Sequence, residues 1–247
     1  MSTHYNNPLV NRCLLLFVLL LLPVVHGCGK KAETTNIKAV GKFVSSFKNI
    51  FEAAEKGYVN DIEYFLEQGA TVNDKDPYGA PLIHVAARFN SDVDVMKYLI
   101  EKGADVNAKF FDGMTTPLFF AVVFNSNIEV AKILIDKGAD VNAKDILGQT
   151  PLLCAASLSD SNIDVLKYLI DKGADVNAKD IGSQTPLHYA AQSPNPNIET
   201  LKYLIEKGAD VNAKDKRGQT PLDFVGPNKE KEAILREAGG KRGEDLP

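Results

Sequence analysis

The sequence has few residues of the types that build metal sites and disulfide frameworks. Among 247 residues there are three cysteines and four histidines, and tryptophan is absent. Cys13, Cys28 and Cys154 are too few and too scattered for a disulfide framework or a CxxC metal site. No glycine-rich phosphate loop, HExxH motif or nucleophile elbow occurs. These absences argue against catalysis, and we expect no cofactor, no metal ion and no small-molecule substrate.

An excess of positive charge is also missing. The formal net charge is -4 at pH 7, whereas nucleic-acid binding requires a clustered positive field. We therefore expect no nucleic-acid partner. The remaining composition, 45% hydrophobic and 24% charged, is typical of a folded protein and not of a disordered or fibrous chain.

Long hydrophobic runs are absent as well, because the longest one extends only from Leu14 to Val25 and is interrupted by Pro23. A membrane-spanning helix needs about 20 apolar residues, so this run is too short to span. Its length and the preceding Arg12 are typical of a secretory signal peptide, which we place at 1–27.

The residues that follow this run are Val25, His26, Gly27 and Cys28, and they resemble a bacterial lipobox. The resemblance implies that Cys28 becomes the lipidated first residue of the mature protein. The polar segment 28–46 would then be a lipid-attached tether. An ordinary cleaved signal peptide, with Cys28 unmodified, is the alternative.

An eight-residue block, KGADVNAK, occurs four times, beginning at Lys102, Lys137, Lys172 and Lys207. The copies are spaced 35 residues apart, and a fixed period of this size is typical of a solenoid of stacked units. Because the block never changes, we interpret it as scaffold. Residues that determine binding specificity should lie where the copies differ.

Each unit contains the signals for two helices. In one copy, Thr150 and Pro151 are a favourable cap and first residue for a helix that ends near Ala156. The segment 163–172 then has apolar residues spaced as in an amphipathic helix, and Gly173 is placed to end it. The sequence therefore predicts an all-α repeat fold.

The combination of Thr-Pro-Leu-His at 185–188, paired alanines and Gly-Ala-Asp-Val-Asn-Ala resembles the ankyrin repeat. This resemblance implies an α-solenoid of stacked helix-turn-helix units with short β-hairpin-like fingers. The units exceed the usual length of about 33 residues, and the surplus lies in the loop between the helices. We place the repeat domain at 47–239, the caps at 49–75 and 215–239, the full repeats at 76–109, 110–144, 145–179 and 180–214, and a flexible tail at 240–247.

The unit 76–109 departs from the pattern, because Pro81 stands where the threonine cap belongs. Its first helix should be less stable by about 1 kcal/mol, the usual effect of a lost cap. After signal removal, the histidines His84 and His188 remain, both at the position that is structural in the family. We expect them to bond neighbouring backbone groups. We interpret Cys154 as a buried small hydrophobic residue.

The finger tips and the ends of the first helices differ between copies, and in ankyrin proteins these two sets line a concave groove that binds partners. We predict that a protein partner contacts Tyr78, Phe89, Phe111, Phe124, Ile146, Leu147, Ile181, Lys216 and Arg217. Exposed rows of apolar side chains are typical of interfaces. For Phe89, Phe124 and Leu158 a second interpretation stays open, in which they pack beneath the lengthened loop.

Together these features predict a non-catalytic protein-binding lipoprotein of the bacterial cell envelope. It would be exported and held by lipid at the periplasmic face or at the outer membrane. Two alternatives use the same groove: a dedicated inhibitor or immunity protein against a toxin, and a secreted effector that acts on host proteins.

Overall fold

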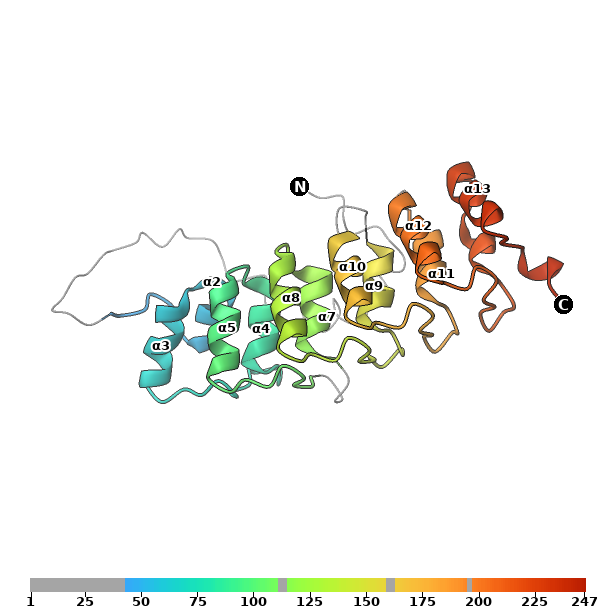
Figure 1. Ribbon diagram of the computed structural model, residues 1–247. Helices are drawn as coiled ribbons and strands as arrows, with labels where there is room; N and C mark the ends of the chain where they lie inside the picture. Colours follow the sequence, from blue (N-terminus) through green and yellow to red (C-terminus); the bar gives the residue numbers. More distant parts are fainter. Residues whose placement is uncertain (1–42, 111–114, 159–162, 195–196) are drawn as a thin grey trace.

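The computed structural model describes residues 43–110, 115–158, 163–194 and 197–247. These residues form an elongated stack of helix pairs, in which each pair follows the previous one along the stack (Figure 1). The predicted signal peptide, the predicted lipidation site Cys28 and the predicted finger residue Phe111 lie outside the described residues.

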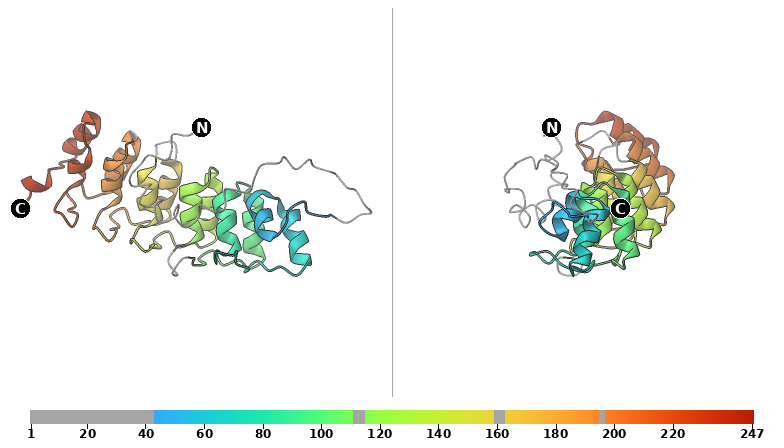
Figure 2. Two further views of the ribbon diagram at one scale, coloured as in Figure 1. Left: turned by 180° about the vertical axis from the view of Figure 1, so that it is seen from behind. Right: turned by 90° about the vertical axis from the view of Figure 1, so that its left-hand side faces the viewer.

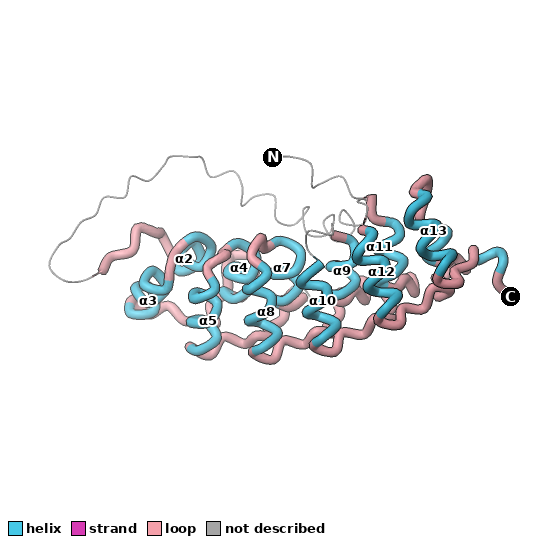
Figure 3. Tube along the Cα trace, turned by 45° about the horizontal axis from the view of Figure 1, so that its top comes forward, coloured by secondary structure: helices cyan, strands magenta, loops and turns pink. Residues whose placement is uncertain are grey.

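The helices form two rows, which Figure 3 separates clearly. The first row holds the first helix of each unit: α2 (Ile50–Lys56), α4 (Leu82–Phe89), α7 (Pro117–Phe124), α9 (Pro151–Ser157), α11 (Pro186–Gln192) and the short 3₁₀ helix η3 (Pro221–Phe224). The second row holds the second helix of each unit: α3 (Val59–Glu67), α5 (Val93–Glu101), α8 (Ile128–Asp136), α10 (Ile163–Asp171), α12 (Ile198–Glu206) and α13 (Lys229–Glu237). In the first row each helix packs on the next, and the second row stacks in the same way. Figures 1 and 2 show the molecule from opposite sides, and in both the two cap units lie at opposite ends of the stack.

Leucines at two repeating positions fill the core between the rows. Leu118, Leu152 and Leu187 of the first helices are at most 1% exposed, and Leu134 and Leu169 of the second helices are fully buried. Full burial of one such side chain contributes roughly 1.5–3 kcal/mol. The paired alanines of the first helices are also buried, and they let neighbouring helices approach closely. The predicted all-α repeat fold is confirmed.

The repeated KGADVNAK block joins each unit to the next. Gly173 ends α10 with φ of 91°, the left-handed conformation that the sequence predicts. The amide of Asn177 then donates to the carbonyl of Gly208 at 3.0 Å and its Oδ1 accepts from the N–H of Asp210 at 2.8 Å. The same asparagine clamp recurs in the copies before it and after it. The block is therefore scaffold.

The fingers contain little β-structure. In the described part of the chain they form only the isolated bridges Lys75–Pro81 and Phe110–Thr115, and Figure 3 draws them as loops. No described helix is both long enough and apolar enough to cross a membrane.

A second ladder of asparagines occupies the lengthened loops between the helices. The side-chain amide of Asn90 donates to the carbonyls of Ala54 at 3.1 Å and Gly57 at 2.9 Å, both in the preceding unit. Asn125 bonds the carbonyls of Ala87 and Asn90 in the same way. These bonds thus satisfy carbonyls at the ends of α2 and α4, where the last carbonyls of a helix have no partner within the helix.

In the carboxy-terminal cap, a lysine takes the place of this asparagine. Lys231 is 1% exposed, and its Nζ donates to the carbonyls of Ala190 at 2.9 Å and Ser193 at 2.7 Å. A cation is favourable at the carboxyl end of a helix, because the helix dipole is negative there. Lys231 therefore holds α13 against the end of α11.

The segment 240–247 was expected to be a flexible tail, and the structure differs from that expectation. The carbonyl of Lys241 accepts from Thr220 Oγ1 at 2.6 Å, and the N–H of Gly243 donates to Asp223 Oδ2 at 2.8 Å. The short 3₁₀ helix η4 (Gly243–Asp245) follows. These bonds to the beginning of η3 give the tail a fixed path, because they satisfy its backbone groups.

Candidate functional site

An aspartate at the start of each described finger turn shapes the tip. Asp145 Oδ1 accepts from the N–H groups of Leu147 at 2.9 Å and Gln149 at 2.8 Å. Gly148 completes the turn with φ of 69°, a conformation that favours glycine. The aspartates that start three other fingers accept the same pair of bonds: Asp76, Asp180 and Asp215. The two residues after each aspartate are thereby held at the tip.

The apolar tip residues remain accessible to different degrees. Tyr78 is 47% exposed and Ile181 is 57% exposed, whereas Ile146 and Leu147 are half-buried. The N–H of Ile181 donates to the carbonyl of Leu147 at 2.9 Å, so these two tips lie side by side. Exposed apolar side chains that form a contiguous patch are typical of contact with another molecule.

The carboxy-terminal end of this row is basic. Lys216 and Arg217 are both exposed, and the N–H of Lys216 donates to the carbonyl of Gly182 in the preceding finger at 2.9 Å. The structure therefore brings the basic tip next to the apolar tip that carries Ile181.

At the ends of the first helices, Phe89 and Phe124 are brought together by an arginine. The guanidinium of Arg88 lies 4.7 Å from the centroid of each ring, within the range of a cation–π interaction. Phe89 is 45% exposed, whereas Phe124 is half-buried and packs against Phe120 with 6.0 Å between ring centroids. The two phenylalanines thus differ, because Phe124 serves the core and Phe89 remains accessible.

The two described histidines link consecutive units. His84 Nε2 donates to the carbonyl of Thr115 at 3.1 Å, and His188 Nε2 donates to that of Gln219 at 3.2 Å. Burial lowers the pKa of His84 to about 4 and also lowers the pKa of His188, so both rings are neutral at pH 7. Their backbone bonds support the structural role expected from the sequence.

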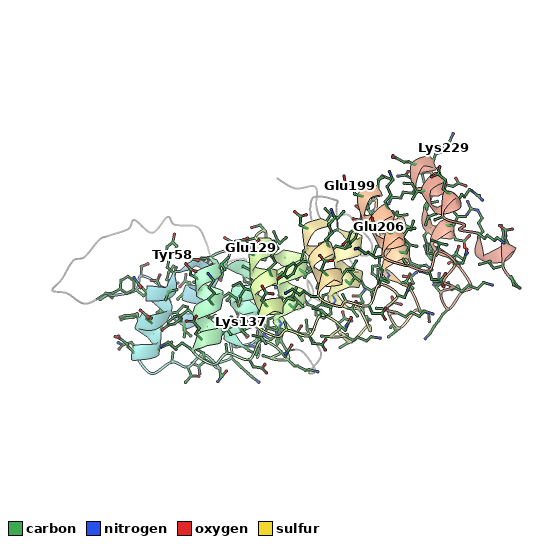
Figure 4. The ribbon with its side chains drawn as sticks, in the orientation of Figure 1. Tyr58, Glu129, Lys137, Glu199, Glu206 and Lys229 are labelled. Atoms are coloured by element: carbon green, nitrogen blue, oxygen red, sulfur yellow. The ribbon has the colours of Figure 1, made fainter. Side chains whose placement is uncertain are left out.

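No group of three or more histidine, cysteine or acidic side chains is arranged to hold a metal ion within the described residues. Charged side chains instead lie spread over the second row of helices. Glu129 and Glu199, near the beginnings of α8 and α12, point outward into solvent (Figure 4). Tyr58 and Lys229 mark the two ends of the stack in the same view.

Sequence reasoning missed several residues beside the predicted surface. One signal was available in the repeat alignment: the fifth residue from the Thr-Pro-Leu threonine is Phe120, Cys154 and Tyr189 in successive units. Tyr189 is 2% exposed, its hydroxyl donates to Asp180 Oδ2 at 3.0 Å, and it accepts from Gln149 Nε2 at 2.5 Å. Cys154 is buried as expected. A change of size at one repeated position alters the space behind the finger.

Comparisons with known proteins agree with this architecture. A family model described as ankyrin repeats (3 copies) matches residues 50–145, 112–180, 144–215 and 179–225. An ankyrin repeat protein of Fowlpox virus (strain NVSL) is 43% identical over 70 residues, which are 28% of this chain and 14% of the viral protein. An ankyrin repeat-containing protein of Schizosaccharomyces pombe is 38% identical over 71 residues, which are 29% of this chain and 33% of the yeast protein. The similarity thus spans a third or less of either relative.

Proposed function

Because the chain belongs to the ankyrin-repeat family, whose members are generally protein-interaction modules, we propose that it binds a protein partner through its finger tips and the adjoining ends of its first helices. The observation that carries this proposal is the exposure of Tyr78 and Ile181 at the tips of fingers whose turns an aspartate holds. Aromatic and large aliphatic side chains are frequent anchors of protein interfaces. Phe89, with Arg88 against its ring, extends the same kind of surface onto the helices.

The change of side-chain character along the row supports one orientation of the partner. The tips change from aromatic at Tyr78, through aliphatic at Ile146 and Ile181, to basic at Lys216 and Arg217. Complementary charge contributes to specificity and to the rate of association. The partner should therefore place acidic groups at the end that carries Lys216 and Arg217.

Site-specific photo-cross-linking tests this surface. A photoreactive residue at Tyr78 or Ile146 should trap the partner, whereas one at Lys167, on the second row of helices, is the matched control. Cross-links should form at the tips in clear excess over Lys167. Equal yields at all three positions would contradict the assignment of the surface.

The place of action that we propose is the bacterial cell envelope, with the chain attached by lipid at Cys28. The support is the apolar run Leu14–Val25 followed by Val25-His26-Gly27-Cys28. Each buried CH₂ contributes about 0.8 kcal/mol, so two or three acyl chains hold a protein on a bilayer without a spanning helix.

Replacement of the cysteine tests the anchor separately from the binding surface. Cys28→Ser should release the protein from membranes while leaving the repeat domain unchanged. Mass spectrometry of the mature amino terminus should find acyl chains on Cys28 of the natural protein. A Cys28→Ser variant that still sediments with membranes would refute lipid attachment.

A further inference from the structure

A small pocket opens beside the predicted tips, between α7, α9 and the finger that begins at Asp145. Its lining includes the rings of Phe119, Phe120 and Phe124, together with Cys154 and Asp145. Its inner space of ≈ 10 Å³ is about enough for one water-sized group. The pocket is therefore small and aromatic and has a carboxylate in its wall.

The next unit shows why the pocket exists. There the first helix carries Tyr189, 35 residues after Cys154, and its hydroxyl donates to Asp180 Oδ2 at 3.0 Å. The tyrosine thereby fills the space behind its finger and satisfies the second carboxylate oxygen. Cys154 is much shorter than a tyrosine, so the equivalent space in its own unit is left open.

Asp145 is oriented as Asp180 is. Each directs Oδ1 to two N–H groups of its own finger turn: Asp145 at 2.9 and 2.8 Å, and Asp180 at 2.8 Å for both bonds. By analogy with Asp180, whose Oδ2 accepts from Tyr189, Oδ2 of Asp145 is expected on the side of Cys154, and both Asp145 and Cys154 line the pocket. The repeat therefore indicates that the second carboxylate oxygen of Asp145 lies toward the pocket.

This carboxylate has no cationic partner among the described residues. Asp145 is 5% exposed, its side chain accepts its two hydrogen bonds at Oδ1, and none of the ion pairs found in that part of the chain includes it. Burial raises the pKa of its carboxyl, and the charge of Asp180 raises it further. The hydrogen bonds from the N–H groups of Gln149 and Leu147 lower the pKa and offset part of the effect of burial, so the negative charge is only partly compensated. A cation that entered the pocket would compensate the rest.

We propose that the pocket receives a primary ammonium group, from a lysine side chain or the amino terminus of the protein partner. This inference rests on the proposed function and names one chemical feature of the partner. Aromatic rings in the lining attract a cation, as the ring of Phe124 already does with the guanidinium of Arg88, and Asp145 Oδ2 would accept a charge-assisted hydrogen bond from the ammonium group. An ammonium group is about the size of a water molecule and fits the inner space, whereas the larger, planar guanidinium of arginine does not.

Titration with a lysine side-chain analogue tests the pocket without knowledge of the partner. n-Butylammonium is added to the full chain while the methyl signals of Val123, which also lines the pocket, are followed by NMR. We expect a saturable shift with n-butylammonium and none with n-butylguanidinium at the same concentration. Absence of a saturable shift, or an equal response to both probes, would overturn the proposal.

Two variants and one control locate the bound probe. Asp145→Asn removes the charge, and affinity for n-butylammonium should fall about tenfold or more, the usual effect of a lost charged hydrogen bond. Cys154→Tyr should fill the space as Tyr189 does and abolish the shift. Asp215→Asn removes the same kind of finger carboxylate elsewhere and should leave the affinity unchanged. Equal affinity in Asp145→Asn and Asp215→Asn would contradict binding at this pocket.

The proposed function and the pocket fail in different ways. If cross-links form at Tyr78 and Ile146 but n-butylammonium does not bind, the pocket inference is wrong and the binding surface stands. If cross-links at the tips do not exceed those at Lys167, the proposed binding surface itself is wrong, whatever the probe does.

Discussion

Pro81→Thr should stabilise the protein, because it repairs a defect that the structure shows at the first full repeat. In the unit 180–214, His188 Nδ1 accepts from the N–H of Thr185 at 3.1 Å and lies 2.9 Å from its hydroxyl. Pro81 holds the equivalent position, three residues before His84, and it has neither group. Nδ1 of His84 is accordingly buried without a hydrogen-bond partner. The side chain that should cap α4 is missing as well.

The size of the effect follows from two stabilising contributions and one destabilising contribution. A buried polar atom without a partner destabilises a protein by about 1–3 kcal/mol, and a missing helix cap by about 1 kcal/mol. Loss of the proline ring increases the conformational entropy of the unfolded chain, which lowers the free energy of unfolding by about 0.4–1 kcal/mol. Since the two gains overlap at one side chain, we expect Pro81→Thr to raise the free energy of unfolding by roughly 1–2 kcal/mol.

Urea denaturation at pH 7, followed by circular dichroism, measures this change. Thr185→Ala is the reverse control: it keeps the backbone N–H to His188 but removes the hydroxyl, and it should lose about 1 kcal/mol. A Pro81→Thr protein with unchanged or lower stability and a native spectrum would refute the reasoning about His84.

Three further predictions concern stability. Burial lowers the pKa of His84 from 6.5 to about 4, so between these pH values the unfolded state binds more protons than the folded state. The free energy of unfolding should therefore be highest above pH 6.5, and by pH 5 this group alone should have lowered it by about 2 kcal/mol. His84→Gln should abolish this part of the pH dependence, which unfolding measured at several pH values would show. Asn90→Ala leaves the carbonyls of Ala54 and Gly57 without their side-chain partner, so the free energy of unfolding measured with urea should fall by about 1–3 kcal/mol. Asn60→Ala, which changes an exposed asparagine, is the control and should leave it unchanged. Lys231→Met removes the hydrogen bonds that hold the last helix to α11, so amide hydrogen exchange should become faster in α13 than in α8. Equal exchange rates in the two helices would show that apolar packing alone holds α13.

Repetition made the architecture predictable from the sequence. A helix-ending glycine such as Gly173 and a reversal asparagine such as Asn177 recur at one spacing, and each has a local physical reason to be there. The positions of the helices and fingers follow from these local rules. The exposure of Tyr78 and Ile181 also agrees with a tip position, because the aspartate turn holds the residues that follow it away from the core.

Features that depend on contacts between units were not predictable in the same way. Lys231 lies in the segment KEKEAILRE, where a lysine is ordinarily solvent-exposed, and its burial is determined by carbonyls of α11 far away in the sequence. The tail after Gly239 has a polar composition typical of a flexible end, yet Thr220 and Asp223, at the beginning of η3, bind its backbone. The pocket at Cys154 becomes visible only when the sizes of residues at one repeated position are compared.

Binding of the purified partner, once it has been captured at Ile146, tests the central claim most directly. Ile181→Asp places a charge on a tip side chain that is 57% exposed, so the fold should not change, whereas Lys202→Ala alters an exposed residue of α12 in the second row. We predict that Ile181→Asp weakens binding by about tenfold or more, as is usual for an interface anchor, and that Lys202→Ala has no effect. Equal affinities for the two variants would contradict a binding surface at the finger tips.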